Sequence, residues 1–190
     1  MKRLLIVGAG GHGRSVAEAV LDSGGYVVVG FLDDSFPELK QVWDVPVLGK
    51  VADMAQLRSV ADCAVVTFGN NLLRQRVTAG LRAAGFLLAT VLHQRAIVSP
   101  TAVIGDGSAI MAGAIIGTGA RLGDGVIVNC AAVVDHHCHV GDFGHLGVNA
   151  AMAGGSVLGA TAWMQAGSVL GCGVKIEAGR VLEPGEAVRS

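Results

Sequence analysis

The sequence has little charge, few aromatic residues and almost no proline. Charged side chains make up 15% of its 190 residues, aromatic side chains make up 4%, and there are four prolines. Disordered chains are polar and highly charged, so this composition excludes intrinsic disorder. Four prolines also exclude a collagen helix, which needs proline throughout a Gly-X-Y repeat. Glycine, by contrast, is abundant at 29 residues.

An excess of positive charge is missing as well. The net charge is −1, so we expect no nucleic-acid partner. Residues 143–174 contain no charged side chain, but glycines and polar residues interrupt them too often for a spanning helix of about 20 apolar residues. The apolar run Leu4–Val7 is shorter than the 7–15 residues, roughly, of a signal-peptide core. We therefore expect no membrane span and a cytoplasmic protein.

Residues 1–95 show strands and helices in alternation. Short apolar strands are expected at Leu4–Val7, Tyr26–Leu32, Val45–Leu48 and Cys63–Thr67, and helices at Ser15–Ser23, Ala52–Val60 and Leu72–Ala84. Such alternation is typical of a parallel sheet covered by helices. The sequence predicts an α/β domain over residues 1–95, half the size of a full dinucleotide-binding domain.

Residues 96–190 repeat every six residues. The repeating position is aliphatic or methionine at Val98, Ile104, Ile110, Ile116, Leu122, Val128, Val134, Val140, Leu146, Met152, Leu158, Met164, Leu170, Ile176 and Leu182. Helices repeat in 3.6 residues and ordinary strands in two, so neither explains this period. Hexapeptide repeats indicate a parallel β-helix, in which each short strand adds one inward side chain. Glycine dominates the next column, where we expect a Cβ to clash as the chain turns.

A glycine-rich motif stands between the first predicted strand and helix. Gly8, Gly10 and Gly13 have the G-x-G-x-x-G spacing that lets backbone N–H groups approach a diphosphate at a helix N-terminus. Asp33 follows at the distance where an NAD enzyme has its ribose-binding acid. The motif indicates a nucleotide site, but the half-size domain leaves little room for the second half of NAD.

Four features in this order resemble the bacterial PglD-like nucleotide-sugar N-acetyltransferases, which are related to perosamine N-acetyltransferases and to the sialic-acid O-acetyltransferase NeuD. The features are Gly8-Ala-Gly-Gly-His-Gly13, Phe31-Leu-Asp-Asp34, Gly69-Asn-Asn71 with Arg74, and the hexapeptide repeat. The resemblance implies a half-Rossmann domain followed by a left-handed parallel β-helix. It also implies acetyl-CoA as co-substrate and a homotrimer with its active site at the subunit interface.

The resemblance further implies a pocket for a UDP-type amino sugar in residues 1–95. Its residues would be Gly8, Gly10, Gly11, His12, Gly13, Asp33, Asp34, Gly69, Asn70, Asn71 and Arg74. Asp33 and Asp34 would recognise the base or ribose, and His12 would contact the diphosphate or the sugar.

The segment 133–139, Val-Val-Asp-His-His-Cys-His, carries the implied chemistry. A histidine with a pKa near the working pH is the usual base for an attacking amine. By resemblance that base is His136. Asp135 is a candidate to orient it, although neighbours on a strand face opposite sides. His137 stands where the family often has a carboxylate.

Other residues are assigned by resemblance alone. Asn129 would lie near the sugar or acetyl group, and His145 and Gly173 near the acetyl donor. Gly154 would donate its N–H to the thioester carbonyl and so stabilise the oxyanion of the tetrahedral intermediate.

Several alternatives stay open. One is O-acetylation of sialic acid or a related sugar by the same base; others are NAD-dependent oxidoreduction and a non-catalytic binding protein. A zinc site is conceivable because His137 and His139, two residues apart, would share a strand face. No fourth ligand is evident, so no metal is expected.

Overall fold

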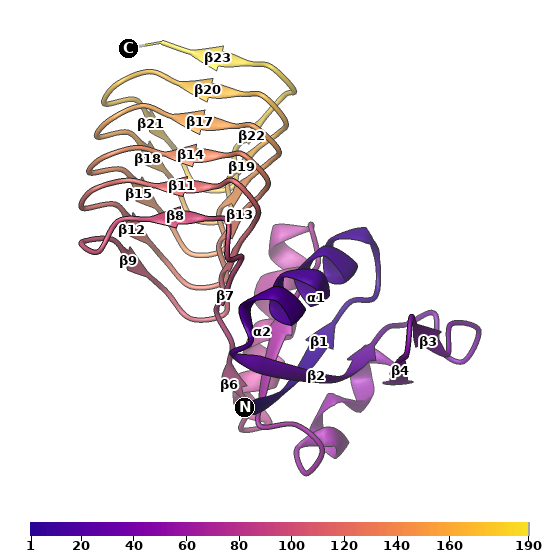
Figure 1. Ribbon diagram of the computed structural model, residues 1–190. Coiled ribbons are helices and arrows are strands. Elements are labelled where there is room, and N and C mark those ends of the chain that lie inside the picture. Colours follow the sequence, from indigo (N-terminus) through magenta and orange to yellow (C-terminus); the bar gives the residue numbers. More distant parts are fainter. Residues whose placement is uncertain (190) are drawn as a thin grey trace. The chain divides into compact units, whose positions relative to one another are not determined.

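The computed structural model describes residues 1–189 and divides the chain into two compact units (Figure 1). The first unit is Met1–Val91, and the second begins at Leu92. This division lies four residues before the predicted end of the α/β domain at residue 95. The reason is that the repeat begins one strand earlier than its first recognised position, Val98.

The first unit is an α/β domain, as predicted. Its sheet has the order β3-β4-β2-β1-β5-β6, and every pair is parallel except β3 with β4. The strands are β1 (Lys2–Val7), β2 (Tyr26–Leu32), β3 (Gln41–Val42), β4 (Val45–Gly49), β5 (Cys63–Val66) and β6 (Leu87–Leu88). The helices are α1 (Gly11–Ser23), α2 (Asn71–Ala83) and the 3-10 helix η1 (Val51–Leu57).

Burial explains these elements. Leu4–Val7 of β1 is entirely buried, as expected of a strand covered on both faces. Helix α1 buries Val16 and Val20 on one side and ends at Gly24, whose φ of 68° suits a residue without a side chain.

Three details differ from the sequence prediction. Helix α1 begins at Gly11, four residues before the predicted Ser15, because part of the glycine motif is itself helical. The predicted helix over Ala52–Val60 is the 3-10 helix η1. Strand β3 was not predicted because its two residues carry no periodic signal and form a strand only by pairing with β4.

The second unit is a left-handed parallel β-helix of two-residue strands on three sheets, here named after their first strands. The β7 sheet contains β7 (Val91–Leu92), β10 (Ala109–Ile110), β13 (Ile127–Val128), β16 (His145–Leu146), β19 (Trp163–Met164) and β22 (Val181–Leu182). The β8 sheet contains β8 (Ile97–Val98), β11 (Ile115–Ile116), β14 (Val133–Val134), β17 (Ala151–Met152), β20 (Val169–Leu170) and β23 (Ala187–Val188). The β9 sheet contains β9 (Val103–Ile104), β12 (Arg121–Leu122), β15 (His139–Val140), β18 (Val157–Leu158) and β21 (Lys175–Ile176).

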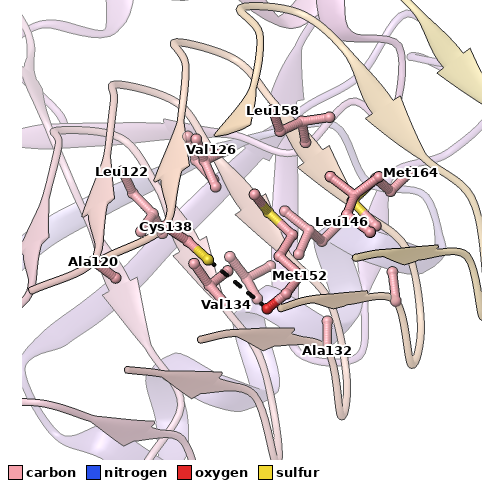
Figure 2. Packing of buried hydrophobic residues seen from close by; sticks show 14 of the residues in the cluster. Ala120, Leu122, Val126, Ala132, Val134, Cys138, Leu146, Met152, Leu158 and Met164 are labelled. Atoms are coloured by element: carbon pink, nitrogen blue, oxygen red, sulfur yellow. Dashed lines mark hydrogen bonds between the residues drawn. The ribbon is translucent and has the colours of Figure 1, made fainter. Parts of the chain in front are cut away.

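The repeating aliphatic position is the second residue of every strand from β8 to β22, as predicted. Figure 2 shows these side chains stacked in the core, where Leu146, Leu158 and Met164 have no exposed surface. Burying each such side chain contributes about 1.5–3 kcal/mol. The stack is therefore what holds the coils together.

Two glycine columns shape the turns between sheets. The column just after the core position makes close contact with the next coil, and a Cβ on Gly159 would lie 2.5 Å from the backbone nitrogen of Ala178. The column two residues further on has positive φ at every sixth residue from Gly107 to Gly185. The predicted glycine clash is confirmed in the first column, and the second column adds a left-handed turn.

Within the described residues, no helix is long and apolar enough to cross a membrane.

Candidate active site

Two glycines hold the turn between β1 and α1 in close contact. Gly8 adopts φ 109°, and its N–H donates to the Leu32 carbonyl at 2.8 Å. A Cβ on Gly13 would overlap the carbonyl oxygen of Gly8. By contrast, no atom beyond the chain neighbours lies within 4 Å of where a Cβ on Gly10 or Gly11 would stand. Gly8 and Gly13 thus close the turn, whereas Gly10 and Gly11 border open space.

That space lies at the N-terminus of α1. Gly10 is the N-cap residue and provides no side-chain cap, and the first intrahelical bond runs from Arg14 N–H to the Gly10 carbonyl at 3.0 Å. The N–H groups of residues 11–13 precede that bond and have no helical acceptor. Such a helix end favours an anionic group such as a phosphate.

His12, which is half-buried, and Arg74, which is buried, interact electrostatically in the same unit. Arg74 is 1% exposed, and its Nη1 donates to the Phe68 carbonyl at 2.8 Å. Burial lowers its pKa to about 10, so it remains a cation near neutral pH. Burial, and then the charge of Arg74, lower the pKa of His12 to about 4. Its buried Nε2 has no hydrogen-bond partner among residues 1–189, so a neutral imidazole there is available to a ligand.

Asp33 and Asp34, the predicted acidic ligands, accept hydrogen bonds from backbone N–H groups in this structure. Asp33 accepts hydrogen bonds from Ala9 N–H at 2.8 Å and from Ser35 N–H at 2.9 Å, one on each oxygen. Burial raises the pKa of Asp33, but these bonds outweigh it and lower that pKa overall. Asp34 accepts from Val51 N–H at 3.0 Å and so fixes the start of η1.

The predicted amide ligands lie at the start of α2. Asn70 caps this helix by accepting from Leu73 N–H at 2.9 Å. Asn71 is 8% exposed, and a Cβ on Gly69 would meet no atom within 4 Å. Asn70 therefore has a structural role, and Gly69 borders open space.

In the second unit, three predicted residues share one corner. This corner, here called the His136 corner, consists of the turns that lead from the β8 sheet to the β9 sheet, including residues 117–120, 135–138, 153–156 and 171–174. The Gly155 N–H donates to the His136 carbonyl at 3.0 Å, and the Gly173 N–H donates to the Gly154 carbonyl at 3.1 Å. His136, Gly154 and Gly173 thus lie on successive coils.

The His136 imidazole lies on this corner with 59% of its side chain exposed. Its Nε2 is 3.7 Å from Asp135 Oδ2, and a Cβ on Gly154 would stand 2.5 Å from the same nitrogen. Its Nδ1 is 3.1 Å from His137 Nδ1. Asp135 follows the end of β14, so the argument from alternating strand faces was wrong for this pair. The carboxylate lies on the Nε2 side of the ring, and His137 lies on the Nδ1 side.

Two other predicted residues lie elsewhere on the β-helix. His145 is on the β7 sheet, which does not adjoin the His136 corner, and Asn129 lies between the β7 and β8 sheets. Sequence reasoning missed Trp163, whose ring stacks on His145 with centroids 5.3 Å apart. The two are 18 residues apart, one full coil, so the period itself could have paired them.

The histidine and cysteine side chains of segment 133–139 are not grouped around one point, as a zinc site would require. His137 lies in the turn before β15, which His139 begins, so the two do not share a strand face. The thiol of Cys138 points into the core and donates to the Ala153 carbonyl at 3.2 Å. Among residues 1–189, no three His, Cys, Asp or Glu side chains are grouped to hold a metal ion.

A half-size α/β domain with an open glycine turn, joined to a left-handed β-helix with an exposed histidine at a corner, defines a hexapeptide-repeat acyltransferase. Three comparisons narrow this class. Residues 3–81 match the family model of the PglD N-terminal domain. PerB from Caulobacter crescentus, solved with CoA and GDP-perosamine, superposes with a TM-score of 0.92 at 34% identity, over 99% of this chain and 89% of that one. The acetyltransferase domain of PglB from Neisseria gonorrhoeae, solved with acetyl coenzyme A, gives 0.77 at 36% identity, over 100% and 96%.

A sequence relative agrees with these structures. The UDP-N-acetylbacillosamine N-acetyltransferase of Bacillus subtilis is 32% identical over 115 residues, which are 59% of this chain and only 52% of that protein. The chain therefore belongs to the PglD-like family of sugar N-acetyltransferases.

Proposed function

We propose that this protein transfers the acetyl group of acetyl-CoA to the amino group of a nucleotide-linked 4-amino sugar. The observation that carries the proposal is the His136 corner. There an exposed imidazole lies against Gly154, whose missing side chain lets Nε2 of the ring come close to the Gly154 backbone. The relatives with CoA or acetyl coenzyme A bound support the donor, and their named sugars support the acceptor class.

The proposed reaction is direct transfer. The sugar amine attacks the thioester carbonyl carbon, a C–N bond forms, and His136 Nε2 takes the proton that the amine loses. The Gly154 N–H stabilises the carbonyl oxygen as it becomes an oxyanion. The C–S bond then breaks, and the CoA thiolate leaves and takes the proton from His136 Nε2, which returns the imidazole to its neutral form. Holding both substrates together removes most of the entropic barrier.

The α/β unit is proposed to hold the nucleotide sugar. The open N-terminus of α1 suits the diphosphate, and the buried Arg74 cation adds attraction for it. His12 would act as a neutral hydrogen-bonding group. The size of the α/β unit, Met1–Val91, favours this function over NAD-dependent oxidoreduction, because it leaves little room for the second half of NAD. UDP is the proposed nucleotide.

We also propose that the protein is a homotrimer with active sites between copies. His145 and Asn129 lie away from the His136 corner, so they could join it only from a neighbouring copy. An apolar ladder on the outer face of the β8 sheet supports such contact. Its residues, the first of each strand, are Ile97, Ile115, Val133, Ala151, Val169 and Ala187.

The activity is tested with acetyl-CoA and a panel of UDP-, GDP- and dTDP-linked amino sugars, with thiol release as the readout. We expect thiol release with a UDP-linked 4-amino sugar and an alkali-stable amide product. Matched 4-hydroxy sugars form the second arm, and an alkali-labile ester from them would instead establish O-acetylation. Thiol release with no member of either arm would refute the proposed function.

The shared site is tested by complementation. The variants His136→Ala and His145→Ala are each expected to be inactive, and after joint unfolding and reassembly a fraction of the sites should regain both histidines. Recovered thiol release supports a site between copies. A monomer by light scattering, or mixed chains as inactive as their parents, would refute it.

A further inference from the structure

His137 has a backbone conformation that its position normally leaves to glycine. The left-handed turn column from Gly107 to Gly185 has positive φ throughout, with glycine at nine positions. The non-glycine members are Ala131, His137, Phe143, Asn149 and Thr161. His137 adopts φ 56°, a conformation that non-glycine residues take uncommonly, although Asn, Asp and His take it more often than the rest. A side chain therefore stands where a glycine would turn more easily.

The turn brings the His137 ring against His136. Their Nδ1 atoms are 3.1 Å apart, the ring centroids are 5.3 Å apart, and the planes meet at 81°. The His137 N–H donates to the Thr118 carbonyl of the previous coil at 2.8 Å, which fixes the turn. The other edge of the ring lies over Gly119, where a Cβ would stand 3.1 Å from His137 Cδ2.

The short distance constrains the protons. Two nitrogens 3.1 Å apart form a hydrogen bond only if one carries a proton and the other offers a lone pair. A His136 ring that is to act as a base through Nε2 must carry its proton on Nδ1. His137 Nδ1 must then be the acceptor, with the His137 proton on Nε2.

We propose that His137 is a positioning residue that accepts a hydrogen bond from His136 Nδ1–H and holds the Nε2 lone pair of His136 ready for the substrate amine. This inference rests on the proposed function. It assigns to a neutral histidine the task that a carboxylate would otherwise perform. When His136 takes the amine proton on Nε2, the resulting imidazolium keeps its bond to His137, so the ring stays in place.

The hydrogen bond depends on the free lone pair of His137 Nδ1. A proton on this nitrogen would remove the acceptor and leave two N–H groups facing each other. The other ionisable group at the ring is Asp135, on the Nε2 side at 3.7 Å. The adjacent coils place Gly119 and Gly154 against the two rings, and neither is charged.

The test uses a series at position 137. His137→Gly relieves the turn and removes the acceptor, whereas His137→Asn keeps an acceptor oxygen near the Nδ1 position and tolerates positive φ. We expect kcat to fall roughly 10–100-fold in His137→Gly, as is typical when an orienting partner is lost, with each KM within about two-fold. His137→Asn should recover most of kcat. The matched control is His139→Ala, which removes a neighbouring exposed histidine.

A structural role and a positioning role of His137 predict opposite rankings of the wild type and the His137→Gly variant in activity. If His137 only served the turn, the glycine variant would be at least as active as the wild type, and that result would overturn the proposal.

An independent readout is ¹⁵N NMR of the free protein. We expect the neutral His136 ring to carry its proton on Nδ1, and this preference to be lost in His137→Gly. A wild-type His136 protonated on Nε2 would overturn the proposal. This measurement needs no turnover, so it tests the role of His137 separately from the proposed acetyl transfer. A failure of the proposed acetyl transfer would show instead as wild-type protein that releases no thiol.

Discussion

Replacing Gly154 by alanine should displace the proposed base, His136, and lower turnover while leaving the stability of the fold nearly unchanged. The new Cβ would stand 2.5 Å from His136 Nε2, and ordinary contact begins at 3.4 Å, so the ring must move by about 1 Å. The ring is exposed, so it can shift without disturbing the core, and φ at Gly154 is not positive; the free energy of unfolding should therefore change by less than about 0.5 kcal/mol. A misplacement of about 1 Å can cost roughly 10²-fold in rate.

The assay is steady-state thiol release, with urea denaturation run on the same samples. Alanine keeps the backbone N–H, so the proposed oxyanion donor remains and only the base is displaced. Gly167→Ala is the converse control, because its Cβ meets no atom but its φ is 69°. It should lose about 1 kcal/mol of stability and keep its turnover. A Gly154→Ala protein with wild-type turnover would refute the placement of the base.

Three further predictions concern stability. The folded state disfavours protonated His12, whose pKa is about 4 against 6.5 for the unfolded chain. Acidification from pH 6.5 to 4 should therefore remove about 3 kcal/mol of stability. Urea denaturation of His12→Gln should lack this dependence of stability on pH. Gly13→Ala should destabilise the protein by about 1–3 kcal/mol, because its Cβ overlaps the Gly8 carbonyl; an unchanged urea midpoint would contradict this contact. Ala131→Gly should raise stability by about 0.5–1 kcal/mol by relieving φ 57° at an exposed turn, and a lower melting temperature would count against that strain.

Most of the fold could be predicted because its signals are local and repeated. Each core position from Val98 to Leu182 is the second residue of a strand, since only one side chain per hexapeptide points inward. The first strand of the repeat was missed although Leu92 keeps the period, because the polar residues after it obscure the pattern. The turn column was also missed, because Phe143 and Thr161 do not signal a left-handed conformation.

The site could be predicted residue by residue but not in its arrangement. The period places His136, Gly154 and Gly173 on one corner, and counting in coils could have shown this. The orientation of His136 could not be inferred, because it depends on the backbone turn at His137 and on Asp135 lying outside the strand. Likewise, no motif reveals that Asp33 is bound by the glycine turn it was expected to accompany.

The most direct test of the account compares wild-type protein with His136→Ala in thiol release from acetyl-CoA, using the best nucleotide-linked amino sugar of the panel. His136 is exposed and its carbonyl bond to Gly155 is made by the backbone, so the variant should fold as the wild type does. The account predicts a loss of turnover of roughly 10²–10⁴-fold, typical of a positioned base. Turnover close to that of the wild type would contradict it.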